Sequence, residues 1–275
     1  MTGQAGSGGR LRLAGKLLLA ILALLALHVG LAVGWLRLDA QSDPQRLIAG
    51  PLPDVTAARV RPYAGDGCRE NRLCQDVVLD PAPERPVRIA ISLPEDAGPE
   101  PLPAVILVGG LRTGREALVH LRDLGRNAVI TYEYPLRGDD VRRGFLPARL
   151  VAMRAAALAV PRQLAAVVRW TRAQPWVDPD RVSLVGVSLG ALALPAAQRM
   201  AAAHGESVGR SILAYGGTGL FDILRANLAR DGPVVAHGAA WLGSLALRAL
   251  EPAFHLPHLE GEFLLINGRD DPRIP

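Results

Sequence analysis

Arg181-Val-Ser-Leu-Val-Gly-Val-Ser-Leu-Gly-Ala-Leu-Ala-Leu194 is the stretch from which the fold of this chain can be inferred. Its apolar run from 182 to 185 is typical of a buried strand, and its alanine- and leucine-rich end is typical of a helix. The glycines in Gly-x-Ser-x-Gly leave room for a very sharp strand-to-helix turn. The pattern predicts Ser188 as a nucleophile at the tip of a sheet and the Leu189 N–H as an oxyanion donor. A plain Gly/Ser-rich turn is the alternative interpretation.

Strand-like and helical segments alternate on both sides of this stretch. We expect an antiparallel hairpin from the first two strand-like segments, and the fully apolar third is expected to be central and parallel. Residues 114–124 and 150–173 are predicted to be helical, with Pro161 starting a second helix. The alternation predicts an α/β fold whose mostly parallel central sheet is covered by helices on both faces. The strand-like segments are 76–79, 87–93, 104–108, 128–132, 212–215 and 263–266.

Length, composition and charge limit the number of domains and the kinds of partner that this chain can have. The 275 residues are enough for one substantial α/β domain and an appendage. The net charge of +5 comes almost wholly from scattered arginines, since Lys16 is the only lysine. No basic stripe interleaves with aromatic residues, so we expect no nucleic-acid partner.

The N-terminus contains an uncharged apolar run at 17–36, which as a helix spans roughly 30 Å, the thickness of a bilayer core. Basic residues precede it, which favours a cytoplasmic N-terminus. We therefore expect a cytoplasmic tail at 1–16, an uncleaved transmembrane signal anchor at 17–36, and a single-pass protein whose catalytic domain lies outside the cytoplasm. The lipid bilayer is then a partner. A cleaved signal peptide is the alternative.

Residues 37–74 are dotted with proline and charge and are predicted to be a linker or stalk. Cys68 and Cys74, the only two cysteines, lie in a short loop of this segment. In an exported chain they are expected to form a disulfide. A two-cysteine metal site is the competing idea, but no histidine or further cysteine lies close in sequence.

Residues 75–275 resemble the α/β-hydrolase superfamily, and within it the dienelactone-hydrolase-like and prolyl-oligopeptidase-like serine hydrolases. The resemblance is carried by the 186–190 elbow, by Gly109-Gly-Leu111, and by the segment from 266 to 275. It implies that Leu111 supplies a second oxyanion N–H, and that Asp271, rather than its neighbour Asp270, is the acid of a catalytic triad. It also implies that no metal or organic cofactor is needed.

The histidines do not fit the order of that family, in which the serine is followed by the acid and then by the histidine. All six precede Asp271 in this chain: 28, 120, 204, 237, 255 and 258. We therefore expect an incomplete product that lacks a final strand, the base and a closing helix, and that is inactive as it stands. The long stretch at about 216–261 is expected to form a lid-like insertion, with a decorated crossover as the alternative.

The function predicted from the sequence is a membrane-anchored, extracytoplasmic serine hydrolase. It would act on a carboxylic ester, a small-molecule acyl substrate, through an acyl-enzyme. A peptidase or thioesterase of the same fold is one alternative. A non-catalytic, hydrolase-like binding module at the membrane surface is the other.

Overall fold

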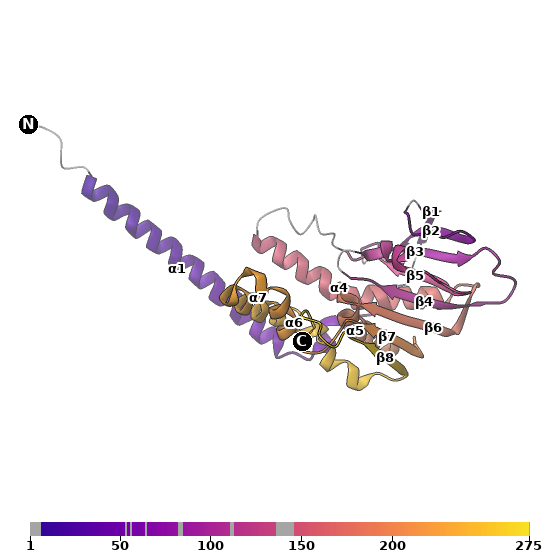
Figure 1. Cartoon of the computed structure of the whole chain (residues 1–275). Coiled ribbons are helices and arrows are strands. Elements are labelled where there is room, and N and C mark those ends of the chain that lie inside the picture. The colour runs from indigo at the N-terminus through magenta and orange to yellow at the C-terminus, as the bar shows by residue number, and fades with distance from the viewer. Residues whose placement is uncertain are drawn as a thin grey trace, which may run out of the picture. The chain divides into compact units, whose positions relative to one another are not determined.

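The computed structural model describes residues 7–52, 54–55, 57–63, 65–81, 85–110, 113–135 and 146–274 (Figure 1). The chain divides into two compact units, Met1–Ser42 and Asp43–Pro275.

The first unit is dominated by one long helix, α1 (Ser7–Ala40), which extends beyond the predicted 17–36 at both ends. Its segment Ala14–Ala40 is long and apolar enough to cross a membrane, and an 18-residue window within it has a mean hydropathy of 2.6. Leu150–Arg172 meets the same criterion among the described residues, but 44% of its apolar 18-residue window is buried. Because a core helix or a signal sequence also satisfies that criterion, length and composition alone are weak evidence of a membrane protein.

The second unit is built on one eight-stranded mixed sheet with the order β1-β2-β3-β5-β4-β6-β7-β8. The first three strands and β5 pair antiparallel, and β5, β4, β6, β7 and β8 pair parallel. This confirms the predicted α/β class, the antiparallel hairpin and the central third segment. The strands are β1 (Ala57–Pro62), β2 (Arg72–Asp80), β3 (Val87–Pro94), β4 (Leu102–Val108), β5 (Ala128–Tyr132), β6 (Val177–Val187), β7 (Arg210–Ala214) and β8 (Glu262–Ile266).

Residues 57–62, which the sequence placed in the stalk, form the edge strand β1. They pair with β2 from Ala57 opposite Asp80 to Pro62 opposite Gln75. The strand is short, bears two arginines and ends in proline, features that suit an edge strand. Its own sequence has no clear alternation, so only the ladder with β2 defines it as a strand.

The helices of the second unit are α2 (Pro44–Ile48), α4 (Leu146–Arg172), α5 (Leu189–Ala203), α6 (Leu220–Asn227) and α7 (Pro233–Ala246), with short 3₁₀ turns η1 (Gly114–His120), η2 (Ala229–Asp231), η3 (Arg248–Leu250), η4 (Pro252–Phe254) and η5 (Leu256–His258). The prediction that Pro161 starts a new helix is wrong, because α4 continues through it. Val160 and Leu164, on either side of this proline, are buried in the core, and that packing offsets the hydrogen bond that proline cannot donate.

Alternate strand residues show which layer covers each face of the sheet. Ile89 and Ile130 belong to the main core with side chains of α4 and α5. Their neighbours Ala90 and Val129 point to the other face and pack against Leu118 of η1. Helical elements therefore cover both faces, as predicted.

Candidate active site

Ser188 lies between the end of β6 and the start of α5, on an exposed turn. Its backbone has φ 56° and ψ −116°, a left-handed conformation that non-glycine residues rarely adopt. Its N–H donates to the Ala214 carbonyl at 2.9 Å, which fastens the turn to β7. Among the described residues, nothing hydrogen-bonds to its hydroxyl, and this hydroxyl does not cap α5. The side chain is thus presented at the carboxyl edge of the sheet, as a nucleophile elbow requires.

The two glycines of the motif are required by close backbone contacts. A Cβ at Gly190 would collide with the Val108 carbonyl at the end of β4. A Cβ at Gly186 would lie 2.8 Å from the backbone nitrogen of Ala191. The start of α5 therefore packs closely against β4 and β6, and this packing sets the backbone position of Ser188.

The predicted oxyanion donors lie in two segments. Leu189 is the first residue of α5, so its N–H is one of the helix's free N-terminal donors. Leu111 lies outside the described residues. Gly110, just before it, passes beside the nucleophile, since a Cβ there would be 3.7 Å from the Ser188 Cβ.

The loop after β4 is fixed by a buried tyrosine. The Tyr134 hydroxyl donates to the Gly109 carbonyl at 2.7 Å. Burial raises the pKa of Tyr134 far above neutrality, so the hydroxyl stays protonated and remains a donor. This anchor was not identified from the sequence, where the tyrosine follows a strand and carries no motif.

Asp271 lies on the loop that follows β8, and strand register shows where that loop begins. Val187 of β6, Ala214 of β7 and Ile266 of β8 are in line across the parallel strands. The segments that follow them, including those of Ser188 and Asp271, therefore leave the same edge of the sheet. One Asp271 oxygen accepts from the Arg273 N–H at 2.8 Å. Asp271 is half-buried, whereas Asp270 is exposed.

Asn267, which the sequence analysis did not single out, holds the start of this loop. Its side chain accepts from the Gly216 N–H at 3.2 Å and donates to the Gly216 carbonyl at 2.9 Å. The amide thereby joins the segments that follow β7 and β8. The only signal in the sequence that could have indicated this role is that Asn267 is a polar residue directly after an apolar strand.

The stretch predicted as a lid contains α6, α7 and four 3₁₀ turns, and it starts from the carboxyl end of β7 (Figure 1). Glu251, which follows α7 and η3, connects this stretch to its own beginning. This carboxylate accepts from the N–H groups of Gly219 and Leu220 at 2.8 and 2.7 Å, at the start of α6. A carboxylate at a helix N-terminus is favourable, so α6 is fixed to the segment that follows α7.

No histidine hydrogen-bonds to Ser188 within the described part of the chain. His204 caps the opposite end of the 15-residue α5, roughly 22 Å along the helix. The His237 ring packs edge-on against Phe221 at 5.2 Å. His255 is fully buried, and its Nε2 contacts the Ala249 carbonyl at 2.8 Å.

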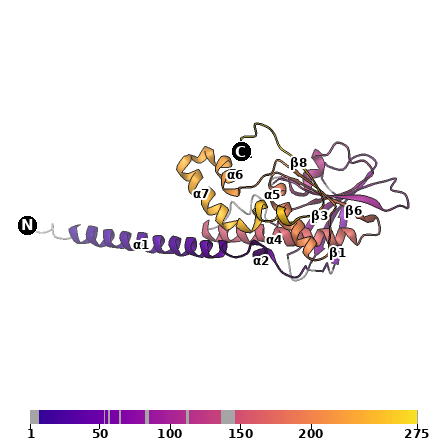
Figure 2. The same cartoon turned by 90° about the horizontal axis from the view of Figure 1, so that it is seen from below.

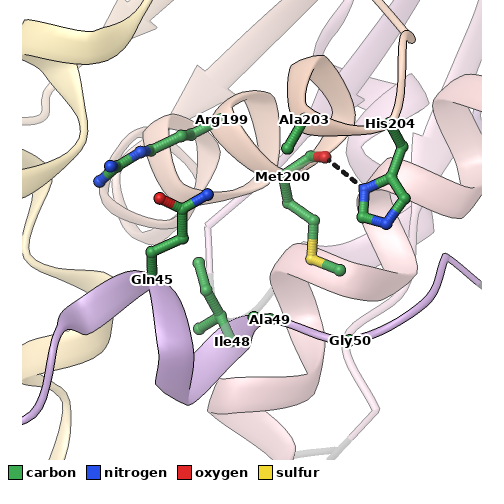
Figure 3. Close-up of a pocket in the computed structure, with 8 residues that line it drawn as sticks. All are labelled: Gln45, Ile48, Ala49, Gly50, Arg199, Met200, Ala203 and His204. Atoms are coloured by element: carbon green, nitrogen blue, oxygen red, sulfur yellow. Dashed lines mark hydrogen bonds between the residues drawn. The ribbon is translucent and has the colours of Figure 1, made fainter.

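A cavity of about 130 Å³ lies near the far end of α5 (Figure 3). Its lining is mainly apolar, and the residues come from the α2 region and the last turns of α5. Since Ser188 is at the other end of that helix, the cavity is not part of the candidate active site. It is lined by Gln45, Ile48, Ala49, Gly50, Arg199, Met200, Ala203 and His204.

The remaining predicted residues concern covalent and metal sites. The structure joins Cys68 and Cys74 in a disulfide with a Cα–Cα distance of 5.8 Å. Among the residues that the structure describes, no group of three or more His, Cys, Asp or Glu side chains is arranged to hold a metal ion.

No family profile matches this sequence, and no curated protein does. Solved structures do match. The acetyl xylan esterase 1 of Thermoanaerobacterium sp. JW/SL YS485 is 16% identical with a TM-score of 0.55, covering 86% of this chain and 80% of that one. The acylaminoacyl peptidase of Pyrococcus horikoshii is 15% identical with a TM-score of 0.55, covering 75% of this chain and 33% of that one. An acetyl xylan esterase from Paenibacillus sp. R4 is 16% identical with a TM-score of 0.50, covering 82% and 85%.

At these identities the likeness concerns the fold. All three matched structures are members of the α/β-hydrolase superfamily. The resemblance inferred from the sequence is confirmed at that level: the second unit of this chain has the α/β-hydrolase fold.

Proposed function

We propose that the protein is a serine hydrolase that cleaves a carboxylic ester through an acyl-enzyme. The observation that carries this is the backbone of Ser188, held at φ 56° between β6 and α5. It lies at the sheet edge from which the Asp271 loop also leaves. Strain of this kind persists where packing enforces it, and it is often found at functional sites.

In the proposed reaction, the Ser188 oxygen attacks the ester carbonyl carbon while its proton passes to a histidine base. The Leu189 N–H and the proposed Leu111 N–H donate to the oxyanion, each lowering the barrier by about 3 kcal/mol. The leaving alcohol takes the proton from the base, and water then hydrolyses the acyl-enzyme by the same steps. Asp271 would hold that histidine in the required tautomer.

The membrane placement is part of this proposal. An uncharged apolar segment in α1 preceded by basic residues supports a single span with residues 1–16 in the cytoplasm. The Cys68–Cys74 disulfide supports an oxidising compartment for the domain. The hydrolase domain would then lie outside the cytoplasm.

A fluorophosphonate probe tests the nucleophile, because it phosphonylates activated serines. A complete product that includes a histidine after Asp271 is expected to be labelled, and Ser188→Ala in the same product is expected to remain unlabelled. Ser207→Ala, which changes an exposed serine before β7, serves as the matched control and should label like the wild type. Equal labelling of wild type and Ser188→Ala would remove Ser188 as the nucleophile.

One observation favours a second candidate, a non-catalytic binding module of the same fold. No described histidine is hydrogen-bonded to Ser188, so the base is not accounted for among those residues. This candidate predicts no labelling even of the complete product. It also predicts that the gene encodes no histidine within roughly 25–40 residues after Asp271, where this fold carries its base. A histidine there, together with labelling of the complete product, would exclude it.

A further inference from the structure

Helix α7 exposes an apolar stripe. Its 14 residues, PVVAHGAAWLGSLA, include no charged side chain. Val234 is 84% exposed, Val235 58% and Leu242 39%, while Ala236 and Ala240 on the opposite side are buried. Their spacing corresponds to one face of a helix. The exposed stripe consists of Val234, Val235, Gly238, Ala239 and Leu242.

The first turns of α4 add to this surface. Leu150 and Val151 are 56% and 71% exposed, and Met153 is also exposed. The next residue, Arg154, donates from Nε to the Ala246 carbonyl at 3.1 Å, so α4 meets the end of α7 here. Both views show the start of α4 and α7 near one end of the sheet (Figures 1 and 2). We call Leu150, Val151, Met153 and the α7 stripe the apolar lid surface.

The apolar lid surface lies toward the carboxyl edge of the sheet, which is also the edge where Ser188 lies. Helix α4 enters the parallel strand β6, so its N-terminal turns lie toward the carboxyl edge. Helix α7 belongs to the segment that leaves the carboxyl end of β7. The lid surface and the candidate active site therefore share one end of the domain.

The connection to the apolar N-terminal helix is short and joins the domain beside this surface. Helix α1 ends at Ala40 and α2 begins at Pro44, a connection that spans at most roughly 14 Å. Ile48 of α2 is buried with Ala249 of η3, the turn that follows α7. Leu158 of α4 packs against the same cluster.

We propose that the apolar lid surface docks onto the lipid bilayer that holds α1. The inference rests on the membrane anchoring proposed above. Exposed apolar patches on a folded domain mark interaction sites, and an uncharged helix face can lie among lipid headgroups. The short connection keeps the domain at the bilayer, which raises the effective concentration of lipid at the surface and lets weak apolar contacts persist. The segment that carries α6 and α7, and the sheet edge with Ser188, then face the membrane.

Depth-dependent quenching of a fluorophore tests this in the full chain. A cysteine introduced as Val234→Cys can be labelled selectively, since Cys68 and Cys74 are disulfide-bonded. The matched control is Ser207→Cys, which is exposed on the loop entering β7 at the opposite edge of the sheet. In phosphatidylcholine vesicles with doxyl-labelled lipid, quenching at residue 234 should be several times stronger than at 207. Adding Val235→Glu and Leu242→Glu should reduce it to the level of the control.

Equal quenching at 234 and 207, with the protein retained in the vesicles, would overturn the proposal. Energy transfer between labels at 234 on different copies, without lipid quenching, would assign the surface to a second copy of the chain and overturn it too. Extraction with alkaline carbonate separates this failure from that of the anchor. If carbonate releases the protein, the membrane anchoring itself is wrong, and the docking proposal falls with it.

Discussion

Strands β6 and β8 lie two positions apart in the parallel part of the sheet, yet their environments differ. Leu184 of β6 is 2% exposed, whereas Leu264 and Leu265 of β8 are 53% and 66% exposed. The proposed nucleophile follows the buried strand, and the proposed acid follows the exposed one. Among the described residues, close packing of the buried strand and α5 sets the position of Ser188, whereas local polar contacts hold Asp271.

Those contacts are specific but few in the part of the chain that the structure describes. Asn267 bonds to both backbone groups of Gly216, and Asn227 donates to the Arg273 carbonyl at 2.9 Å. At the elbow, by contrast, packing of Gly190 on the Val108 carbonyl leaves no room for a side chain at residue 190. The proposed nucleophile, Ser188, is thus held by close backbone packing, whereas the proposed acid, Asp271, lies on a loop held by hydrogen bonds.

A pair of leucine truncations tests the contrast most directly. Leu184→Ala removes a buried side chain and is expected to lower the free energy of unfolding by about 2–5 kcal/mol. Leu265→Ala removes an exposed one and should change that free energy by no more than about 0.5 kcal/mol. Urea denaturation of both variants measures the difference. Similar losses in the two variants would show that β8 is as well packed as β6.

Substitution of Gly190 tests how strictly packing holds the nucleophile. Gly190→Ala places a Cβ against the Val108 carbonyl and should destabilise the domain by about 1–3 kcal/mol, with loss of fluorophosphonate labelling. Gly209→Ala is the matched control, because nothing lies within 4 Å of the Cβ position there. A Gly190→Ala variant as stable as Gly209→Ala would contradict the close approach of α5 to β4.

A smaller effect on stability, which depends on pH, is expected from His255 in the segment between β7 and β8. Burial lowers the pKa of His255, opposed by its hydrogen bond to Ala249 and reinforced by Arg199. In the unfolded chain the His255 imidazole takes up a proton as the pH falls to about 6.5. In the folded chain the same imidazole takes up its proton only at a lower pH. Stability should consequently fall as the pH drops below about 6.5, by at most about 1.4 kcal/mol per pH unit.

Urea denaturation between pH 8 and pH 5.5 measures this dependence. His255→Gln should flatten it, whereas His120→Gln, at an exposed histidine, should leave it unchanged. An unchanged pH dependence in His255→Gln would show that the buried imidazole is not its source.

Much of the fold was predictable because its signals are local. The apolar segments became strands β2 to β8, and the Gly-x-Ser-x-Gly pattern became a turn between β6 and α5. Strand β1 was missed because it is a strand only through its ladder with β2. The course of α4 through Pro161 was mispredicted because core packing, which has no local pattern, outweighs the proline's preference.

The candidate site, like the fold, has some features that local sequence predicts and others that depend on tertiary contacts. Local sequence was sufficient to place Ser188 and Leu189 in a strand-to-helix turn and to indicate the apolar N-terminal helix, since strand, turn and helix patterns depend on near neighbours. Only the tertiary structure brings the segments of Ser188 and Asp271 to one edge, through the register of β6, β7 and β8. The same holds for the Val108 carbonyl that makes Gly190 necessary. Such contacts join residues far apart in the chain, and their geometry is set by the packing of the whole sheet.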